Sequence, residues 1–513
     1  MMEHKRGTCG TCAWELYQGT LVIAPENEKE GILAEPDDLP MNEWPWREYA
    51  GTIKEVLIAD GVRAGRSAAG LFRYMEMCSG FEIEQLDMSG TEDMSCMFDG
   101  CSGLEDLSPV SGWNTANVRY MCGMFEDCDA LCSTSTLKGW DTGKVEDMSD
   151  MFCMCSSLKD LSGLAGWDTG NVTNMSYMFA KCFSLSDISP LAGWDTKNVA
   201  QTDYMFYVCS ALDDISPLAG WDTGNVQIMT HMFVLTKTAD TSPLRGWNVK
   251  NVRDMSFAFS GCRSLSDLSG LAGWDTGNAV YMEGMFDGCI LLNDLSGLAG
   301  WDTKNVVSMS MMFCECLMIQ DISALSGWNT GKVKTMNGMF RKCRSVSDIS
   351  VLSGWNTENA EEMNEMFMEC GISDGSVIKL WNTGSVKTFR SIFGRTRIPA
   401  EQMREIIPMA CPKEGAFIGY KKCRNDDIVE LLIPENAQRS SGYGRKCRCD
   451  RAEVVRITNR YGLEVQRAVS MRDARLTYRK GGTVRVQNFD KNRFNECAAG
   501  IHFFMTKEEA ESY

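Results

Sequence analysis

Long apolar runs are missing from this sequence of 513 residues, although 44% of its residues are hydrophobic. A helix that spans a membrane needs about 20 consecutive apolar residues, so none is predicted. Histidine is scarce, with only His4, His231 and His502, and there is no phosphate-binding glycine loop, H-E-x-x-H or G-x-S-x-G motif. The sequence therefore lacks the marks of a membrane protein and of the common hydrolase and nucleotide-binding classes.

Signals for export and anchoring are also missing. The first twelve residues, MMEHKRGTCGTC, contain no run of seven apolar residues, and the ending TKEEAESY offers no hydrophobic tail or lipidation cysteine. We therefore expect neither export by the standard route nor attachment to a membrane. The 23 cysteines are an odd number, which favours mostly reduced thiols in a reducing compartment.

Basic residues are fewer than acidic ones, but not everywhere. The chain carries 51 Lys+Arg and 69 Asp+Glu, a net charge of −18. Residues 395–513 hold 23 basic and 16 acidic residues, whereas residues 1–394 hold 28 and 53. Because an acidic protein repels nucleic acids and anionic membranes, neither nucleic acid nor a membrane is expected as a partner. The C-terminal segment is predicted to form a different, basic surface.

A sequence repeat with a period of about 27 residues occupies most of the chain. The tryptophan positions advance by 27 from one unit to the next, shortened twice to 26, and Leu86 starts one further unit. Twelve units, from about residue 86 to 396, share the consensus W-[DN]-T-x-x-V-x-x-M-x-x-M-F-x-x-C-x-x-L-x-D-[LI]-x-x-L-x-G. The tryptophans are Trp113, Trp140, Trp167, Trp194, Trp221, Trp247, Trp274, Trp301, Trp328, Trp355 and Trp381.

One unit cannot bury its own apolar side chains, so the repeat predicts a solenoid whose coils stack on one another. We expect a short helical or 3-10 turn through V-x-x-M-x-x-M-F, a corner at C-x-x-L, a short strand around L-x-D-[LI] and a return turn at G-W-[DN]-T. Phenylalanine keeps its position in every unit and is the predicted least replaceable core residue: Phe98, Phe125, Phe152, Phe179, Phe206, Phe233, Phe259, Phe286, Phe313, Phe340, Phe367 and Phe393.

The unit resembles a known repeat family. Its segments M-F-x-x-C-x-x-L-x-x-[LI] and G-W-[DN]-T-x-x-V resemble the BspA-type leucine-rich-repeat family, in the tryptophan-containing subgroup of bacterial surface proteins and mycoplasma lipoproteins. The start, Gly7-Thr8-Cys9-Gly10-Thr11-Cys12-Ala13-Trp14, is similar to the segment that precedes such repeats. The resemblance covers about residues 7–396 and implies adhesion or protein recognition through variable surface positions. Surface members usually carry an export signal and an anchor, and because we expect neither here, surface display is not expected.

Three segments are predicted: an N-terminal β-rich cap over residues 1–85, an α/β solenoid of the leucine-rich-repeat type over 86–396, and a small α+β domain over 397–513. In the last of these, 398–411 reads as a helix interrupted by Pro408, and 428–433, 452–458, 463–469, 483–489 and 501–505 read mostly as strands. Thr506 and Glu509 form a capping box for a final helix.

Ten cysteines share one position in the coil, which allows either a metal or disulfide ladder or a row of buried thiols. Stacked side chains point in parallel, whereas a disulfide needs its Cβ atoms turned toward each other, so buried thiols are the favoured interpretation. The ten are Cys101, Cys128, Cys155, Cys182, Cys209, Cys262, Cys289, Cys316, Cys343 and Cys370.

Aspartates form two further ladders. The first follows each tryptophan and alternates with asparagine, so turn formation is a better explanation than a calcium site. The second is predicted to mark the edge of a binding face beside the strand. Its members are Asp106, Asp160, Asp187, Asp214, Asp267, Asp294, Asp321 and Asp348. The coil of 221–246 is irregular, with Thr236 in place of Cys and Thr241 in place of Asp, and is interpreted as a stacking defect or a kink that shapes the surface.

The C-terminal segment resembles a domain of unknown function typical of bacteriophage and prophage proteins. The residues that carry the resemblance include Tyr420-Lys421-Lys422-Cys423, Leu432-Ile433-Pro434-Glu435 and Asn495-Glu496-Cys497-Ala498-Ala499-Gly500-Ile501-His502. Cys497 and His502 are weak candidates for a nucleophile and its base, against a structural histidine. Arg439, Arg445, Lys446, Arg448 and Arg451 could meet phosphates, but docking on the acidic solenoid is favoured because interleaved aromatic residues are few.

No metal or cofactor is expected. Zinc bound jointly by Cys9-x-x-Cys12 and Cys447-x-Cys449 would require two distant loops to meet. We predict a non-enzymatic recognition or adhesion-type protein that binds a protein or glycan partner through the solenoid, is encoded by a phage or prophage, and resides in the bacterial cytoplasm or a phage particle. Self-association through the basic domain is a further expectation. The alternative is an effector enzyme with catalysis in the C-terminal domain and the solenoid selecting the substrate.

Overall fold

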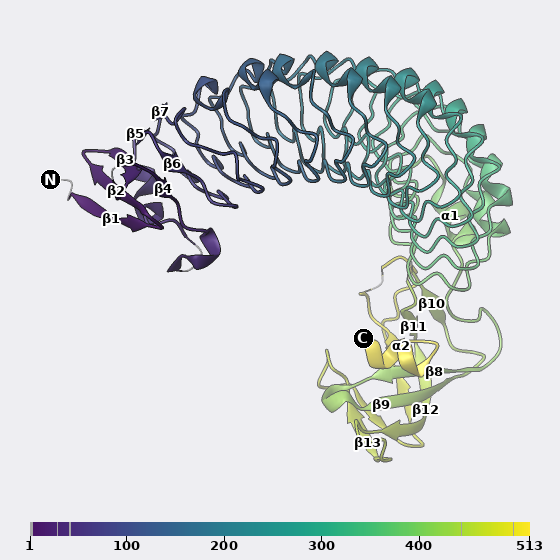
Figure 1. The fold of residues 1–513 in the computed structure, drawn as a ribbon. Coiled ribbons are helices and arrows are strands. Elements are labelled where there is room, and N and C mark those ends of the chain that lie inside the picture. Colours follow the sequence, from purple (N-terminus) through teal and green to yellow (C-terminus); the bar gives the residue numbers. More distant parts are fainter. Residues whose placement is uncertain (1–3, 28, 41–42, 443, 496) are drawn as a thin grey trace. The chain divides into compact units, whose positions relative to one another are not determined.

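The computed structural model describes residues 4–27, 29–40, 43–442, 444–495 and 497–513. The chain forms two compact units, Met1–Val333 with Met339–Ser347, and Lys334–Gly338 with Asp348–Tyr513. Both units contain stacked repeat coils (Figure 1). The predicted fold class, a solenoid of 27-residue coils with a β-rich N-terminal cap and a small C-terminal α+β domain, is confirmed.

The first unit begins with a sheet of strand order β1-β2-β3-β5-β7. Strands β1, β2 and β3 pair antiparallel, whereas β3, β5 and β7 pair parallel. The cap therefore changes from hairpin pairing to the parallel stacking that the coils use. The strands are β1 Lys5–Cys9, β2 Cys12–Tyr17, β3 Thr20–Pro25, β5 Glu55–Ile58 and β7 Gly80–Glu82, with β4 Gly31–Ile32 paired to β6 Val62–Arg63 and 3-10 turns η1 Pro36–Asp38 and η3 Arg47–Thr52.

Coil stacking begins before residue 86. The buried ring of Phe72 lies 5.3 Å from that of Phe98, a contact that the later coils repeat. This early coil has no tryptophan, and Ala68 and Met75 stand where later coils have Met and Cys. The tryptophan spacing could not reveal it for that reason.

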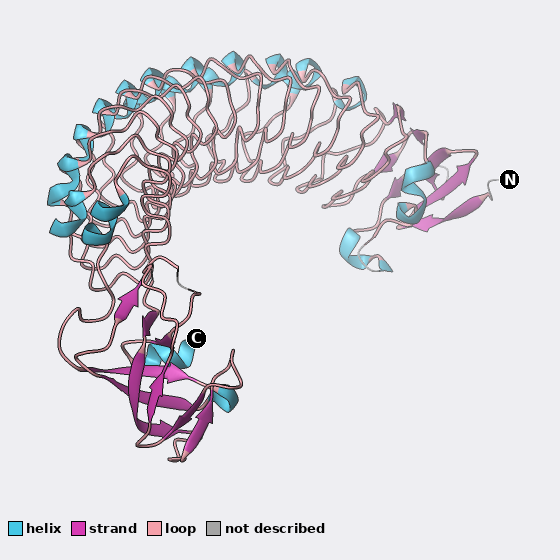
Figure 2. Cartoon of the chain, turned by 180° about the vertical axis from the view of Figure 1, so that it is seen from behind, coloured by secondary structure: helices cyan, strands magenta, loops and turns pink. Residues whose placement is uncertain are grey.

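A 3-10 turn recurs along the repeat, in most coils at S-x-L-x-G, and in Figure 2 these turns follow one another along the repeat coils. Their N-terminal serines follow the L-x-D-[LI] segment directly. The turns are η4 Ser108–Val110, η5 Ser135–Gly139, η6 Ser162–Leu164, η7 Ser189–Gly193, η8 Ser216–Gly220, η9 Ser242–Gly246, η10 Ser269–Leu271, η11 Ser296–Leu298, η12 Ser323–Leu325, η13 Ser350–Gly354 and η14 Ser376–Leu380.

The predicted order of elements within the coil was wrong. The M-x-x-M-F segment is not helical, because the second residue between the methionines has a positive φ, as at Tyr177 (φ 59°) and Tyr204 (φ 58°), which breaks a helix. Parallel pairing occurs instead just before the first methionine, for example between Asp147 and Asn174. The pairs before the methionine are isolated bridges, and those around L-x-D, such as Ser133 with Asp160, are isolated in the same way.

The core consists of side-chain ladders that run from coil to coil. Each ladder phenylalanine is buried, and ring centroids in the first unit are 5.8 Å apart between Phe179 and Phe206 and 5.9 Å apart between Phe206 and Phe233. Polar groups follow the same repeat: the indole N–H of Trp194 donates to Leu164 O at 3.1 Å. Such a bond gives a buried indole N–H an acceptor in the neighbouring coil.

The second unit ends in a compact domain preceded by α1 Ala400–Ile406. An antiparallel sheet of order β15-β12-β9-β8 packs its apolar side chains with a second sheet, β10-β11-β16, into one core. The capping box at Thr506 is confirmed, since its side chain accepts the N–H of Glu509. The elements are β8 Phe417–Lys422, η15 Arg424–Asp426, β9 Ile428–Ile433, β10 Arg439–Ser441, β11 Cys447–Cys449, β12 Arg451–Thr458, β13 Arg467–Val469, β14 Thr477–Arg479, β15 Thr483–Arg485, β16 Ile501–Phe503 and α2 Lys507–Ser512.

Candidate binding face of the repeat array

A row of stacked aromatic side chains crosses four consecutive coils at the positive-φ position, two residues after the first methionine position of the repeat. We call Tyr177, Tyr204, His231 and Phe257 the aromatic ladder. Their ring centroids are 4.4, 4.3 and 4.8 Å apart, with interplanar angles of 5°, 6° and 21°. The left-handed backbone turns each of these side chains away from the buried methionines beside it, and all four remain half-buried.

Backbone bonds between coils set the spacing of this ladder. The N–H of Tyr177 donates to Asp203 O at 2.9 Å, and the N–H of Tyr204 donates to Thr230 O at 2.8 Å. The row ends at Gly284, where an added Cβ would lie 2.2 Å from the ring of Phe257. A side chain at this position would displace the Phe257 ring, so glycine is needed beside the last ring of the ladder.

Exposed apolar side chains lie near the ladder in sequence: Ile228 and Leu235 flank His231 in its own coil, and Tyr281 belongs to the coil that follows that of Phe257. Ile228 is 37% exposed, Leu235 44% and Tyr281 45%. Large apolar groups that remain accessible in one region of a soluble protein commonly mark a binding surface. The ladder and these three residues form the candidate binding face.

The binding face carries little charge of its own. Burial raises the pKa of the Tyr177 hydroxyl to about 12, with Tyr204 and Asp203 adding to the shift. Burial also lowers the pKa of His231, against the opposite effect of the Asp254 and Asp203 carboxylates. Both side chains are therefore neutral at pH 7, and the acidic groups surround an uncharged row of rings.

Sequence reasoning missed this face. It concentrated on what every coil shares, whereas the ladder lies at a position that varies from coil to coil. The signal was nonetheless present: four consecutive units carry Tyr, Tyr, His and Phe at the second residue after the first methionine position. A column-by-column comparison of the variable positions would have found it.

The aspartates predicted to mark a binding face lie at the start of the 3-10 turns. In each case one carboxylate oxygen accepts the N–H of the serine two residues later, for instance Asp187 from Ser189 at 2.8 Å. The Ser133 hydroxyl, together with the N–H of Ser162, lowers the pKa of Asp160, and the N–H of Ser350 lowers the pKa of Asp348. Equivalent bonds occur at Asp106, Asp160, Asp214, Asp267, Asp294, Asp321 and Asp348. The carboxylates have a structural role, and a role in partner binding stays a prediction.

The irregular coil keeps this aspartate. Asp240, not residue 241, accepts the N–H of Ser242, the first residue of η9, at 2.6 Å. This coil is one residue shorter than the 27-residue repeat, and the deletion therefore lies between Thr236 and Asp240. The hydroxyls of Thr236 and Thr238 bond to each other at 3.0 Å in the buried corner. The prediction that Thr241 replaces the aspartate was wrong, because the deletion precedes it.

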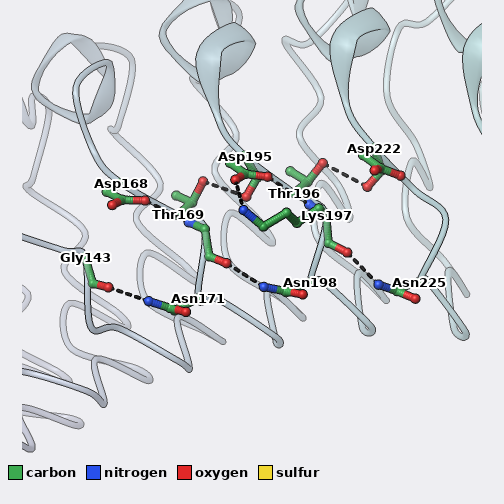
Figure 3. Close-up of polar contacts among 11 residues, drawn as sticks. Gly143, Asp168, Thr169, Asn171, Asp195, Thr196, Lys197, Asn198, Asp222 and Asn225 are labelled. Atoms are coloured by element: carbon green, nitrogen blue, oxygen red, sulfur yellow. Dashed lines mark hydrogen bonds and ion pairs between the residues drawn. The ribbon is translucent and has the colours of Figure 1, made fainter.

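The Asx residues after the tryptophans form turns. Figure 3 shows Asp168, whose carboxylate accepts the N–H of Gly170 at 3.0 Å. Beside it, the hydroxyl of Thr169 donates to Asp195 O at 3.0 Å, and the amide of Asn171 donates to Gly143 O at 2.6 Å. These side chains join one coil to the next, which explains why the D-T-x-N pattern recurs.

The ten ladder cysteines are buried free thiols. Cys182 Sγ donates to the carbonyl of Phe152 in the preceding coil at 3.1 Å, and Cys209 repeats this contact with Phe179 at 3.0 Å. Burial raises the pKa of these thiols well above the usual value of a cysteine. They are therefore protected both from solvent and from ionisation.

Brief alkylation of the native protein with iodoacetamide is expected to modify Cys132 and Cys497, which are exposed. Cys122 should react as well, because a hydrogen bond with Cys96 lowers its pKa and thiolates are the reactive form. The ladder cysteines should react only after unfolding. Mass spectrometry of the digested protein measures each site, and rapid modification of the whole ladder would contradict this assignment.

Cys497 and His502, the candidate nucleophile and base, lie in different structural settings. Cys497 lies in an exposed turn, whereas His502 lies in β16, half-buried and paired in register with Arg448 of β11. The carbonyl of His502 accepts a bond from the Lys421 ammonium at 3.2 Å. The structure thus gives His502 a place in a sheet, and catalysis by this pair gains no support from it.

The five basic residues predicted to dock on an acidic surface all make contacts within the C-terminal domain. Arg448 is 2% exposed and donates to Ala499 O and Asn492 O, while Arg445 pairs with Glu509 at 2.6 Å. Arg439 bonds to carbonyls of the same domain, Lys446 lies over the ring of Tyr513, and Arg451 pairs with Asp450. Docking of these side chains on an acidic surface stays a prediction, and it would compete with these contacts.

The cysteine motifs considered for zinc are buried in separate units. Cys9 and Cys12 face each other across the turn between β1 and β2, and Cys447 and Cys449 lie in β11. Burial raises the pKa of Cys12 to about 11.

The repeat array matches one protein family model four times, over residues 67–163, 130–241, 235–325 and 293–405. The family is described as "Mycoplasma protein of unknown function, DUF285", and these matches together span well over half of the sequence. The chain belongs to this family, so the predicted mycoplasma and BspA-like repeat is confirmed. Residues 407–510 match a second model, described as "Family of unknown function (DUF5758)".

Two solved structures are similar at low identity. One is a leucine-rich repeat protein from Eubacterium ventriosum ATCC 27560, 14% identical over 71% of this chain and 94% of that chain, with a TM-score of 0.34. The other is a leucine rich cell surface protein from Faecalibacterium prausnitzii A2-165, 15% identical over 67% and 93%, with a TM-score of 0.31. No curated protein matches the sequence. Among the residues with described positions, none of the helices has the length and apolar character to span a membrane.

Proposed function

We propose that the chain is a non-enzymatic recognition protein that binds a protein or glycan partner through the repeat array. The observation that carries this proposal is the aromatic ladder with its exposed apolar neighbours. A solenoid keeps its core constant and varies its surface, so a patch of unusual residues on four coils is where recognition is expected.

Aromatic side chains are the usual centres of binding energy at protein surfaces. The ladder offers ring edges and a tyrosine hydroxyl at each of two steps, while the stacked ring faces cover one another. A partner would therefore meet a rigid, preorganised strip, and ordering it on binding costs little conformational entropy.

Three further points belong to the proposal. The C-terminal domain resembles one typical of phage proteins, which supports a phage or prophage origin. Residence in the bacterial cytoplasm or a phage particle follows from that origin. Self-association through the basic domain is the second interaction in this proposal, and it would compete with the internal pairs of Arg445 and Arg451.

Replacing Tyr204 with alanine in the full chain is expected to weaken partner binding by about 30-fold or more, the loss typical of an interface hot spot. Tyr204 stacks on both Tyr177 and His231, so its removal interrupts the ladder at its centre. The tagged chain and its variant would be compared by pull-down from bacterial lysate, with proteins and glycoconjugates identified by mass spectrometry and the Kd of the captured partner then measured.

Two controls make this experiment decisive. Tyr461→Ala removes a tyrosine that is 71% exposed in the C-terminal domain and should leave binding unchanged. Asp187→Asn tests the aspartate row separately. A partner that binds wild type and Tyr204→Ala equally would refute the ladder as the site, and loss of binding only in Asp187→Asn would place recognition on the aspartates instead.

A further inference from the structure

Three metal-ligating side chains meet on two adjacent coils, just before the aromatic ladder begins. They are Glu126, from one coil, and Asp150 and Cys153 from the next, and their ligand atoms all lie within 4.8 Å of one another. Asp150 occupies the coil position that Tyr177 holds in the following coil. Glu126 and Cys153 occupy equal positions in their two coils, directly after the ladder phenylalanine.

The backbone holds the three residues in place. The N–H of Cys153 donates to Asp150 O at 2.9 Å, and the N–H of Asp127 donates to Cys153 O at 2.8 Å. One bond fixes two ligands within a coil, and the other fixes this coil against the one that carries Glu126. The geometry is therefore part of the repeat and does not depend on flexible loops.

The thiol of Cys153 distinguishes this cluster from an ordinary group of surface acids. Cys153 is 6% exposed, and among the described residues its Sγ makes no hydrogen bond, although it lies within 4.8 Å of an oxygen of each carboxylate. The neighbouring ladder residue Cys155, by contrast, donates to Phe125 O at 3.1 Å. A buried polar group that is left unpaired costs free energy, and one cation bound by the thiolate and both carboxylates would satisfy all three groups.

Two cations among the described residues, Arg73 and Lys181, lie near the cluster, but neither forms an ion pair with the Glu126 or Asp150 carboxylate. The guanidinium of Arg73, which lies near the cluster, pairs with Asp99 at 2.6 Å. Neither Glu126 nor Asp150 forms an ion pair among the described residues. Two half-buried carboxylates that face each other repel, and a bound cation would remove that repulsion.

We propose that Glu126, Asp150 and Cys153 form a zinc-binding site. A thiolate with two carboxylates suits a borderline-soft ion such as Zn²⁺, whereas Ca²⁺ and Mg²⁺ take oxygen ligands only. Three protein ligands leave a fourth tetrahedral position for water or for a group of a partner. On binding, the thiol gives up its proton to solvent and the thiolate takes a place in the coordination shell. The site does not depend on the function proposed above.

The chain contains a matched comparison at a second pair of coils. Asp287 and Cys314 occupy the positions of Glu126 and Cys153, but Met311 stands at the position of Asp150. There the thiol of Cys314 is paired with the Asp287 carboxylate. This second pair is expected to bind zinc much more weakly, because it lacks the second carboxylate.

The test uses the full chain, purified under reducing conditions, stripped with a chelator and titrated with zinc chloride against a competing zinc indicator. Wild type should bind one zinc ion more than Cys153→Ser, and Glu126→Gln and Asp150→Asn should each raise the Kd of that ion at least ~10-fold, the smallest loss seen for metal-site partners. Cys314→Ser should behave as wild type. Cobalt(II) should give a thiolate charge-transfer band in wild type and Cys314→Ser that Cys153→Ser lacks.

The melting temperature of each stripped variant shows that it folds, and if Cys153→Ser does not fold, the two carboxylate variants decide the outcome. Zinc should raise the melting temperature of wild type more than that of Glu126→Gln. The proposal is overturned if wild type takes up no zinc, or if Cys153→Ser, Glu126→Gln and wild type bind the same amount with the same affinity. The other thiols, such as Cys9 and Cys12, would then account for any zinc retained.

Discussion

Replacing Phe206 with alanine is expected to lower the free energy of unfolding by about 3–5 kcal/mol, the range for removal of a buried phenylalanine. Phe206 is 0% exposed, and its ring stacks between Phe179 and Phe233 at 5.8 and 5.9 Å. Loss of the ring would leave a cavity and would also remove two stacking contacts. Since each coil contacts only its neighbours, the damage should interrupt the array at this point.

Phe183→Ala provides the matched control. Phe183 belongs to the preceding coil but is 46% exposed, so its removal should change stability by no more than about 0.5 kcal/mol. Urea unfolding of both variants gives the difference, and amide hydrogen exchange shows where protection is lost. Equal stability of the two variants would mean that the phenylalanine ladder is not the core of the coil.

The part of the fold that the sequence predicted is the part that every coil repeats. Buried Phe206 and Cys209 were assigned correctly because an apolar residue that returns once in every repeat must face the same neighbours in each coil. The role of the recurring Asx residues after each tryptophan was also predicted correctly. The Asx residue after Trp167 forms a turn, as the mixture of Asp and Asn indicated.

The sequence did not show where the coil is helical. M-x-x-M-F has helical spacing, but Tyr177 and Tyr204 adopt positive φ, and the bonds from their N–H groups to the next coil favour that conformation. Local spacing cannot reveal a preference that arises from stacking. The 3-10 turn lies where an aspartate such as Asp187 accepts a serine N–H, a short-range signal that was interpreted as a binding site.

The aromatic ladder and the Glu126 cluster were missed for a related reason. Both depend on residues from adjacent coils that lie about one repeat apart and belong to no shared motif. In the C-terminal domain, Arg448 looked like a surface residue, but it is buried and bonds to the carbonyls of Ala499 and Asn492, which are distant in the sequence. Charge alone did not reveal that the fold itself uses this residue.

The glycine of S-G-L is the second position with a large expected effect. Gly270 of η10 lies against the preceding coil, and an added Cβ would be 1.7 Å from Thr241 O. That carbonyl already accepts the N–H of Leu244 at 2.9 Å, which closes η9. Gly270→Ala must therefore push the two coils apart or break this turn, at a cost of about 3 kcal/mol, the upper end of the usual range for overpacking.

Gly273→Ala, three residues later, is the control: it makes the same change in backbone flexibility without the steric clash expected at Gly270. Gly273 has no atom within 4 Å of an added Cβ and does not have a positive φ, so alanine fits there. Because alanine restricts the unfolded chain, this variant should be more stable than wild type by about 0.4–1 kcal/mol. Urea unfolding measured side by side should move the two variants in opposite directions. A Gly270→Ala protein as stable as wild type would show that the coils can separate at this point without loss, and the close contact between η9 and η10 would then have no role in holding the array together.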